Sequence, residues 1–253
     1  MTKAKRRRRA CRRRQLTFAE ARPKSGRGGY REGAGRKPKG EKAGVPHRTR
    51  PTIPSGCPVH VTNTLLPDLP NLRKRTIYRK LYPVFCEVNQ RWRGAFRIVH
   101  YSVQRNHIHL VCEVHGRRNL SRAMQSFKIR MVNVINTYLG RESGTVFADR
   151  YHERILRRPT HARNALAYVL LNGRRHGEDR GHPRPERWID PFSSARYFDG
   201  WRESIESGAG PPAMDEEAPV RPPRSWLLKA GWRRGRGGLI SILETPGPKP
   251  YAR

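Results

Sequence analysis

Apolar and polar positions alternate over short distances in the run from Phe96 to Val114, FRIVHYSVQRNHIHLVCEV. Apolar and β-branched residues dominate on both sides of Asn106, which predicts two strands joined near that residue. Successive side chains of a strand point to opposite faces. We therefore expect His107 and His109 on one face, with Ile108 in the core behind them.

Hydrophobic residues spaced three or four apart indicate helices on either side of these strands. Pro83 lies within the first such pattern and leaves open whether that helix is continuous or breaks there. The expected elements are a strand at 59–62, a helix capped by Asn71 and ending at Gly94, the two strands around Asn106, a helix capped by Asn119 and ending at Gly140, a strand within 144–156, and a helix from Thr160 to about Gly173 or Gly177.

This order of elements is that of a split βαβ unit, so the fold class expected is α+β, ferredoxin-like or RRM-like. We expect an antiparallel sheet with helices on one face and the other face open for a site. The histidine pair would lie on a central strand. The expected division is a disordered basic arm at 1–54, a folded domain at 55–202, a Pro/Gly linker at 203–224 and a basic tail at 225–253.

The charge balance changes what partners are expected. The formal net charge of +34 over 253 residues implies a polyanionic partner, for which nucleic acid is the default. No apolar run is long enough to cross a membrane, and the four cysteines lack the C-x-x-C spacing of zinc fingers. The candidate DNA-binding residues are Arg6, Arg7, Arg8, Arg9, Arg12, Arg13, Arg14, Arg36, Lys37, Arg150, Arg174 and Arg175.

Candidate chemistry comes from two places in the chain. Two imidazoles on one strand face can chelate a divalent metal. In the third expected helix, the i, i+4 spacing of Tyr168 and Asn172 puts both on one face. A tyrosine can act as a covalent nucleophile, and an amide oxygen can bind a hard metal. A packed tyrosine and a turn-forming asparagine are the structural alternatives.

The segments HIHLVCE, VFADRYHERIL and ALAYVLLNGRRHG, in this order, resemble the single-tyrosine HUH transposases, in particular the bacterial REP-associated tyrosine transposases. The resemblance spans about residues 57–200. It implies a cytoplasmic transposase that cleaves and rejoins single-stranded, hairpin-forming DNA through a 5′-phosphotyrosine. It further implies His107, His109 and Asn172 as ligands of Mg²⁺ or Mn²⁺, with Tyr168 as nucleophile and Tyr151 as the less favoured rival. Whether the enzyme is a homodimer stays open.

Two other functions remain to be weighed. A ferredoxin-like sheet with basic tails is also typical of non-catalytic nucleic-acid-binding modules, which expose aromatic residues on the central strands. Here those strands carry Phe96, His100 and Tyr101, without an RNP-like signature. The other alternative is a domesticated transposase that acts at chromosomal repeats, which the sequence does not separate from a mobile element's own enzyme.

Overall fold

The computed structural model describes residues 49–182, 185–203 and 217–247. All of them belong to one compact unit, Val45–Arg253. Within these ranges, no helix is both long enough and apolar enough to cross a lipid bilayer.

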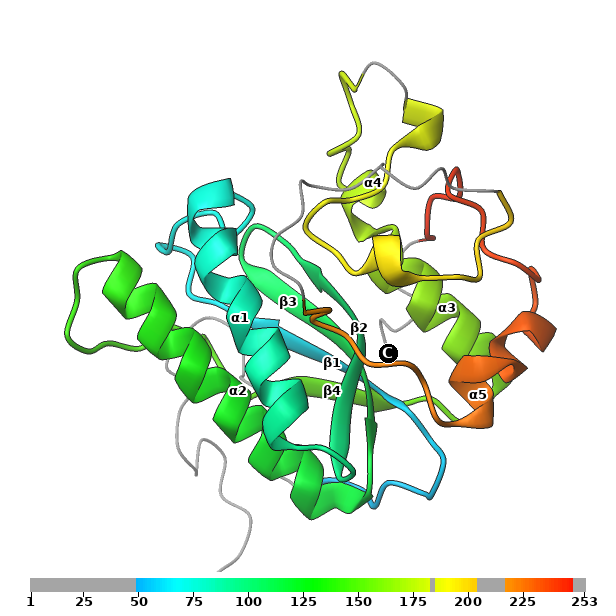
Figure 1. Ribbon diagram of the computed structural model, residues 1–253, viewed down its shortest axis with the longest axis horizontal. Coiled ribbons are helices and arrows are strands. Elements are labelled where there is room, and N and C mark those ends of the chain that lie inside the picture. The colour runs from blue at the N-terminus through cyan, green and yellow to red at the C-terminus, as the bar shows by residue number, and fades with distance from the viewer. Residues whose placement is uncertain (1–48, 183–184, 204–216, 248–253) are drawn as a thin grey trace, which may run out of the picture. The chain divides into compact units, whose positions relative to one another are not determined.

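Four antiparallel strands form one sheet in the order β2-β3-β1-β4 (Figure 1). The α+β class, the two strands around Asn106 and the central position of the histidine-bearing strand are therefore confirmed. The strands are β1 (Val59–Thr64), β2 (Phe96–Val103), β3 (His107–Val114) and β4 (His152–Ile155).

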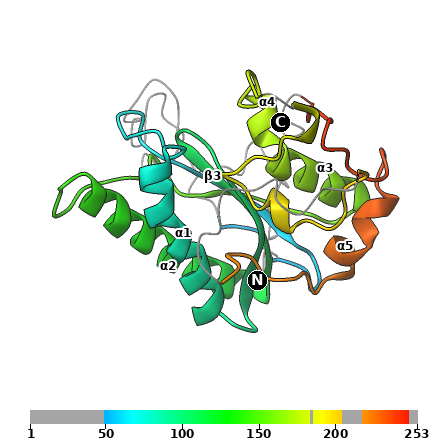
Figure 2. The same ribbon diagram turned by 45° about the horizontal axis from the view of Figure 1, so that its top comes forward.

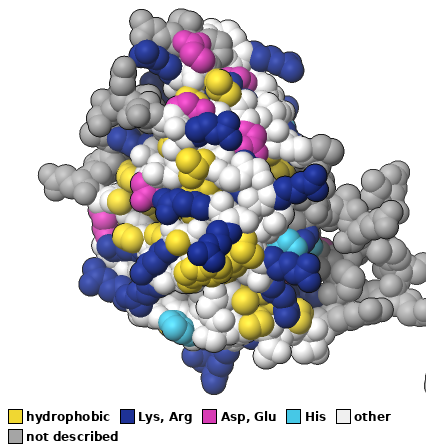
Figure 3. Space-filling view, turned by 90° about the vertical axis from the view of Figure 1, so that its right-hand side faces the viewer, with side chains coloured by type: hydrophobic (Ala, Val, Ile, Leu, Met, Phe, Trp, Pro, Cys, Tyr) yellow, Lys and Arg dark blue, Asp and Glu magenta, His cyan; other side chains and the backbone are white. Residues whose placement is uncertain are grey.

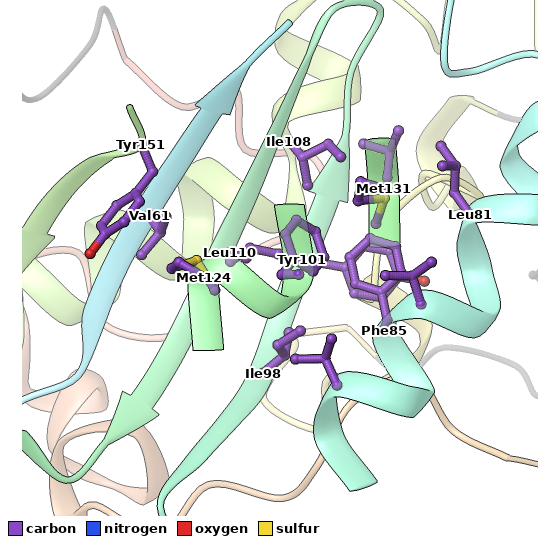
Figure 4. Packing of buried hydrophobic residues seen from close by; sticks show 14 of the residues in the cluster. Val61, Leu81, Phe85, Ile98, Tyr101, Ile108, Leu110, Met124, Met131 and Tyr151 are labelled. Carbon is purple, nitrogen blue, oxygen red and sulfur yellow. The ribbon is translucent and has the colours of Figure 1, made fainter. Parts of the chain in front are cut away.

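Two helices, α1 (Arg75–Arg91) and α2 (Gly116–Tyr138), cover one face of the sheet (Figure 1). Figure 4 shows the core between them, in which the ring of Phe85 from α1 stacks on Tyr101 from β2 with centroids 4.1 Å apart. Ile108 is fully buried in this core, as expected from the alternation. We call this first hydrophobic cluster the α1/α2 core.

The starts of these helices differ from the expectation. The α1 helix begins at Arg75, and Asn71 does not cap it: its side chain accepts a hydrogen bond from the backbone N–H of Arg73 in a turn before the helix. Pro83 lies inside α1 without breaking it, since the residues around it are held by burial. Asn119 is not a cap, because α2 already begins at Gly116.

A third helix, α3 (Pro159–Leu170), lies on the opposite face of the sheet (Figures 1 and 2). The expectation of helices on one face is therefore wrong. The physical reason is that α3 is apolar around most of its circumference, with residues 165–170 all buried. Such a helix needs cover on more than one side, and it packs on Val99 and Val111 of the sheet in a second cluster.

Residues 217–247, which were expected to be linker and tail, are folded: Val220 is buried in the α1/α2 core, and a later part of the segment covers the other side of α3. Leu227, Leu228, Trp232 and Ile240 are buried in the second cluster with α3. We call the part of this segment that packs on α3, residues 225–244, the C-terminal strap. The strap contains the short helices α5 (Trp226–Lys229) and η3 (Gly231–Arg234). Three others lie between α3 and the strap: α4 (Asn172–Arg175), η1 (Pro185–Arg187) and η2 (Ala195–Tyr197).

Candidate active site

The predicted histidine pair lies on one face of β3. His107 is paired with Thr64 and His109 with Thr62 of the neighbouring strand β1. The two imidazole rings have centroids 4.7 Å apart. This is the face opposite the α1/α2 core, so the prediction that the two side chains share a face is confirmed.

Neighbouring groups orient both imidazoles. Nδ1 of His107 lies 3.0 Å from Oδ1 of Asn106, and an amide oxygen can only accept a hydrogen bond. Nδ1 of His109 lies 3.0 Å from Oγ1 of Thr62 and 3.3 Å from Nε2 of His60. With the proton on Nδ1, each ring presents the lone pair of Nε2, which is the arrangement that hydrogen-bond partners of the other ring nitrogen impose on metal-binding histidines.

His60 is a member of this site that the sequence analysis missed. Burial, reinforced by the nearby charges of His152 and Arg154, lowers the pKa of His60 to about 4. His60 is therefore neutral at pH 7 and can accept a hydrogen bond from Nδ1 of His109. The available signal was its position two residues before Thr62, which places both side chains on one face of the strand.

Tyr168 reaches the same face from α3. Its ring meets that of His109 edge to face, with centroids 5.1 Å apart, and lies 5.9 Å from that of His60. Burial raises the pKa of the Tyr168 hydroxyl, and the guanidinium of Arg175 acts in the opposite direction. That guanidinium lies 5.5 Å from the ring centroid. The positive charge of Arg175 is thus placed to stabilise the deprotonated, phenolate form of Tyr168 when the reaction begins.

The rival tyrosine lies elsewhere. Tyr151 packs into the α1/α2 core, beside Val61 in Figure 4. This core lies on the face of the sheet opposite to His107 and His109. Its ring is covered by the guanidinium of Arg50 at 3.7 Å from the centroid. The sheet therefore separates Tyr151 from the histidine pair.

Asn172 does not share a helix with Tyr168, contrary to the expectation. Helix α3 ends at Leu170, and Leu171 adopts φ −108° and ψ 14° before α4 begins. Asn172 is fully buried, and among the described residues neither its amide nitrogen nor its amide oxygen has a hydrogen-bond partner. A buried amide left without partners is costly, so an additional ligand for its oxygen is the physical expectation.

The position of Asn172 is fixed by the next residue. A Cβ at Gly173 would collide with the carboxylate of Asp190 and the ring of Trp188, so only glycine fits there. Asp190 is held by a bidentate pair with Arg73, with N–O distances of 2.9 and 3.0 Å. A buried, doubly bonded pair of this kind holds its two segments in a definite register.

The types of donor present suit a divalent cation bound by nitrogen and oxygen. Two oriented imidazoles and an unsatisfied amide oxygen are donors that Mn²⁺ and Mg²⁺ accept. In the described ranges, no group of three His, Cys, Asp or Glu residues has the geometry of a metal site. The ring of His176 lies edge to face with that of His107, with centroids 6.2 Å apart, and is a neighbour of the histidine pair that the sequence analysis missed.

The predicted DNA-binding residues fall into two groups. Arg6, Arg7, Arg8, Arg9, Arg12, Arg13, Arg14, Arg36 and Lys37 lie outside the described residues. Of the others, Arg150 is half-buried, Arg174 is engaged by Asp179 at 2.7 Å, and Arg175 lies against Tyr168. Of these three, only Arg175 has a described contact with the candidate nucleophile.

His107 and His109 on a central strand and Tyr168 from a helix meet on one face of a ferredoxin-like sheet. This arrangement defines a class of protein. Residues 63–169, which include all three side chains, match the family described as "Transposase IS200 like". The resemblance to single-tyrosine transposases predicted from the sequence is thereby confirmed for this part of the chain.

One similar solved structure is described as "Structure of the REP associates tyrosine transposase bound to a REP hairpin". It is 21% identical over 60% of this chain and 84% of that chain, with a TM-score of 0.47. No curated protein sequence matches the chain.

Proposed function

We propose that this protein is a transposase that cleaves and rejoins single-stranded, hairpin-forming DNA through a 5′-phosphotyrosine on Tyr168. The observation that carries the proposal is the edge-to-face contact of Tyr168 with His109, at 5.1 Å between centroids, in a segment that matches IS200-like transposases. His107, His109 and Asn172 are proposed to hold the divalent cation, Mg²⁺ or Mn²⁺.

The chain's own residues perform the covalent step. The oxygen of Tyr168 attacks the scissile phosphorus, the Tyr168–phosphorus bond forms, and the bond from phosphorus to the 3′ oxygen breaks. The free 3′-hydroxyl can reverse the step on a second strand, so no nucleotide cofactor is required. Arg175 stabilises the phenolate as Tyr168 releases its proton to solvent, and the leaving 3′ oxygen takes up a proton from solvent to become the free 3′-hydroxyl. When bound, the cation would polarise the phosphate and offset its developing charge.

The non-catalytic alternative is less well supported by the central strands. Phe96 and Tyr101 are buried in the α1/α2 core and present no aromatic surface for bases. His100 is buried against Ser194 and Phe198, with its Nδ1 3.2 Å from Oγ of Ser194. A module that reads single strands on its sheet would leave these rings exposed.

The test is incubation of the full chain with single-stranded hairpin DNA and Mn²⁺, followed by denaturing electrophoresis and mass spectrometry. A covalent protein–DNA adduct that disappears in EDTA is the expected result. Cleavage that is undiminished in EDTA would contradict the role of His107 and His109. Sequence-specific binding without any adduct would favour the non-catalytic module.

A further inference from the structure

The C-terminal strap carries an exposed tryptophan that the proposed chemistry does not use. Trp226, the first residue of α5, is 55% exposed, whereas the next two residues, Leu227 and Leu228, are buried against α3. We propose that the Trp226 indole is a stacking platform for an unpaired base of the DNA strand that Tyr168 attacks. This inference rests on the proposed function and extends it to a binding site outside the active site.

The indole is held in a fixed orientation. A Cβ at Gly231 would lie 2.6 to 2.9 Å from three carbons of the six-membered ring, so the ring packs directly on the Gly231 backbone. The start of α5 is capped by the side chain of Ser225, which accepts a hydrogen bond from the backbone N–H of Leu228 at 3.4 Å. A ring that is already fixed loses little conformational entropy when a base stacks on it.

Positive charge lies beside the ring. The guanidinium of Arg234 lies 5.8 Å from the centroid of Trp226. Figure 3 shows the face on which α5 lies, with hydrophobic side chains exposed among Lys and Arg. Within the part of the chain that the structure describes, no ion pair is formed by the exposed cations nearby, which are Arg224, Lys229, Arg233, Arg234 and Arg236.

This combination of groups fits one chemistry. An aromatic ring with a guanidinium over it, in a segment that carries further exposed cations, is the way proteins bind single strands, since the bases stack and the phosphates meet the charges. A protein partner would have to bring several carboxylates to the same small surface. The unneutralised cations therefore favour a nucleic-acid strand as the occupant.

The location also fits a strand that passes through the active site. The backbone N–H of Arg236 lies 3.3 Å from Oγ1 of Thr160, so the strap meets α3 at the helix start. Tyr168 lies near the other end of the same helix, about 12 Å further along at 1.5 Å per residue. A few nucleotides of an unpaired strand cover that distance. Unpaired DNA that flanks a hairpin can thus extend from Tyr168 to the strap that carries Trp226.

Binding of two labelled DNA probes to the full chain tests the inference. One probe is a hairpin with unpaired flanks, and the other is the same hairpin with blunt ends. The proteins carry Tyr168→Phe to prevent covalent trapping, and fluorescence anisotropy is read at roughly 0.2 M salt to suppress nonspecific binding. Trp226→Ala should weaken binding of the flanked probe by roughly 5- to 100-fold and leave that of the blunt probe unchanged.

Two variants control the result. Trp226→Phe should keep most of the affinity, because a smaller aromatic ring still stacks. Ile129→Ala removes an equally exposed hydrophobic residue, 52% exposed on α2 across the sheet, and should change nothing.

The outcomes separate this inference from the proposed function. Equal affinity of Trp226→Ala and its parent for the flanked probe overturns the platform, while adduct formation by the chain with Tyr168 intact would still support the transposase. An equal loss for both probes also overturns it. A change in oligomeric state of Trp226→Ala by light scattering, without a change in DNA affinity, would show a protein interface instead.

Discussion

The ring of Tyr168 from α3 stands nearly perpendicular to that of His109 from β3, at an interplanar angle of 81°. The contact joins a candidate nucleophile to a candidate metal ligand across two elements that are far apart in the sequence. Among the described residues, the Tyr168 hydroxyl has no hydrogen-bond partner. The ring of Tyr168 contributes to packing and its hydroxyl does not, so a substitution by phenylalanine removes the hydroxyl without disturbing the packing.

Tyr168→Phe should therefore abolish the covalent DNA adduct with little change in stability. The variant keeps the ring in the second cluster and deletes only the oxygen that would attack phosphorus. The free energy of unfolding should change by less than about 1 kcal/mol, since no hydrogen bond is lost. Mass spectrometry of the tryptic phosphotyrosyl peptide measures the adduct.

Tyr151→Phe is the matched control and should retain the adduct, because Tyr151 lies on the opposite side of the sheet. A phosphotyrosyl peptide that maps to Tyr151 would show that the active site does not lie on the face of the sheet that carries His107 and His109.

Thr62→Val should weaken divalent-metal binding. The Thr62 hydroxyl lies 3.0 Å from Nδ1 of His109, and its loss would free the ring to change tautomer or orientation. Loss of such a supporting group typically lowers metal affinity by roughly 10- to 100-fold. Titration calorimetry with Mn²⁺ in the absence of DNA gives the affinity. Thr76→Val, which alters an exposed threonine on α1, should leave it unchanged, and equal losses would refute the role of Thr62.

The parts of the site that depend on local periodicity could be predicted from the sequence. The period of two in a strand is enough to place His107 and His109 on one face and Ile108 in the core. The contact of His60 with His109 could not be predicted, because it depends on the register between β1 and β3. A strand of alternating residues does not specify which residue of a distant strand it faces.

Other differences arise where tertiary packing decides the outcome. The apolar run from Ala165 to Leu170 correctly predicted a helix. The burial of this helix on two sides, however, depends on the C-terminal strap. That segment is rich in Arg and Gly and reads as a tail. Its few apolar residues, Trp232 and Ile240 among them, are nevertheless fully buried. The break at Leu171 has no marker in the sequence.

The strap should be necessary for stability, and two of its tryptophans allow a matched test. Trp232 is 1% exposed and packs on α3, whereas Trp226 is largely exposed. Trp232→Ala should lower the free energy of unfolding by about 3 to 5 kcal/mol, in line with truncation of buried aromatic residues. Trp226→Ala should cost far less. Urea denaturation measures both, and similar losses would mean that the strap is not part of the folded core.

Asn172→Leu should stabilise the metal-free protein and weaken its binding of Mn²⁺. The buried amide of Asn172 lacks hydrogen-bond partners among the described residues, and a leucine of similar volume removes the cost of burying it. The gain should be about 1 kcal/mol or more in urea denaturation. Asn63→Leu is the control, since Asn63 is also buried without partners but points to the other face. It should stabilise the fold without changing the affinity for Mn²⁺, and a loss of affinity in both variants would argue against Asn172 as a ligand.

Acid should destabilise the protein partly through His100. Burial lowers the pKa of His100 to about 3 in the folded protein, against an ordinary value of 6.5. Between these two values the unfolded chain binds a proton that the folded chain does not, so stability is complete above pH 6.5 and falls as the pH decreases toward 3. One such group contributes a slope of up to about 1.4 kcal/mol per pH unit.

His100→Gln keeps a polar side chain near Ser194 but removes the titrating group. Its free energy of unfolding, measured by urea denaturation at several pH values between 4 and 7, should therefore depend less steeply on pH than that of the parent. Some dependence must remain, because the pKa of His60 is also lowered by burial, to about 4. An unchanged slope in His100→Gln would show that His100 takes up its proton in the folded state, and hence that its environment is more open to water than the packing against Phe198 indicates.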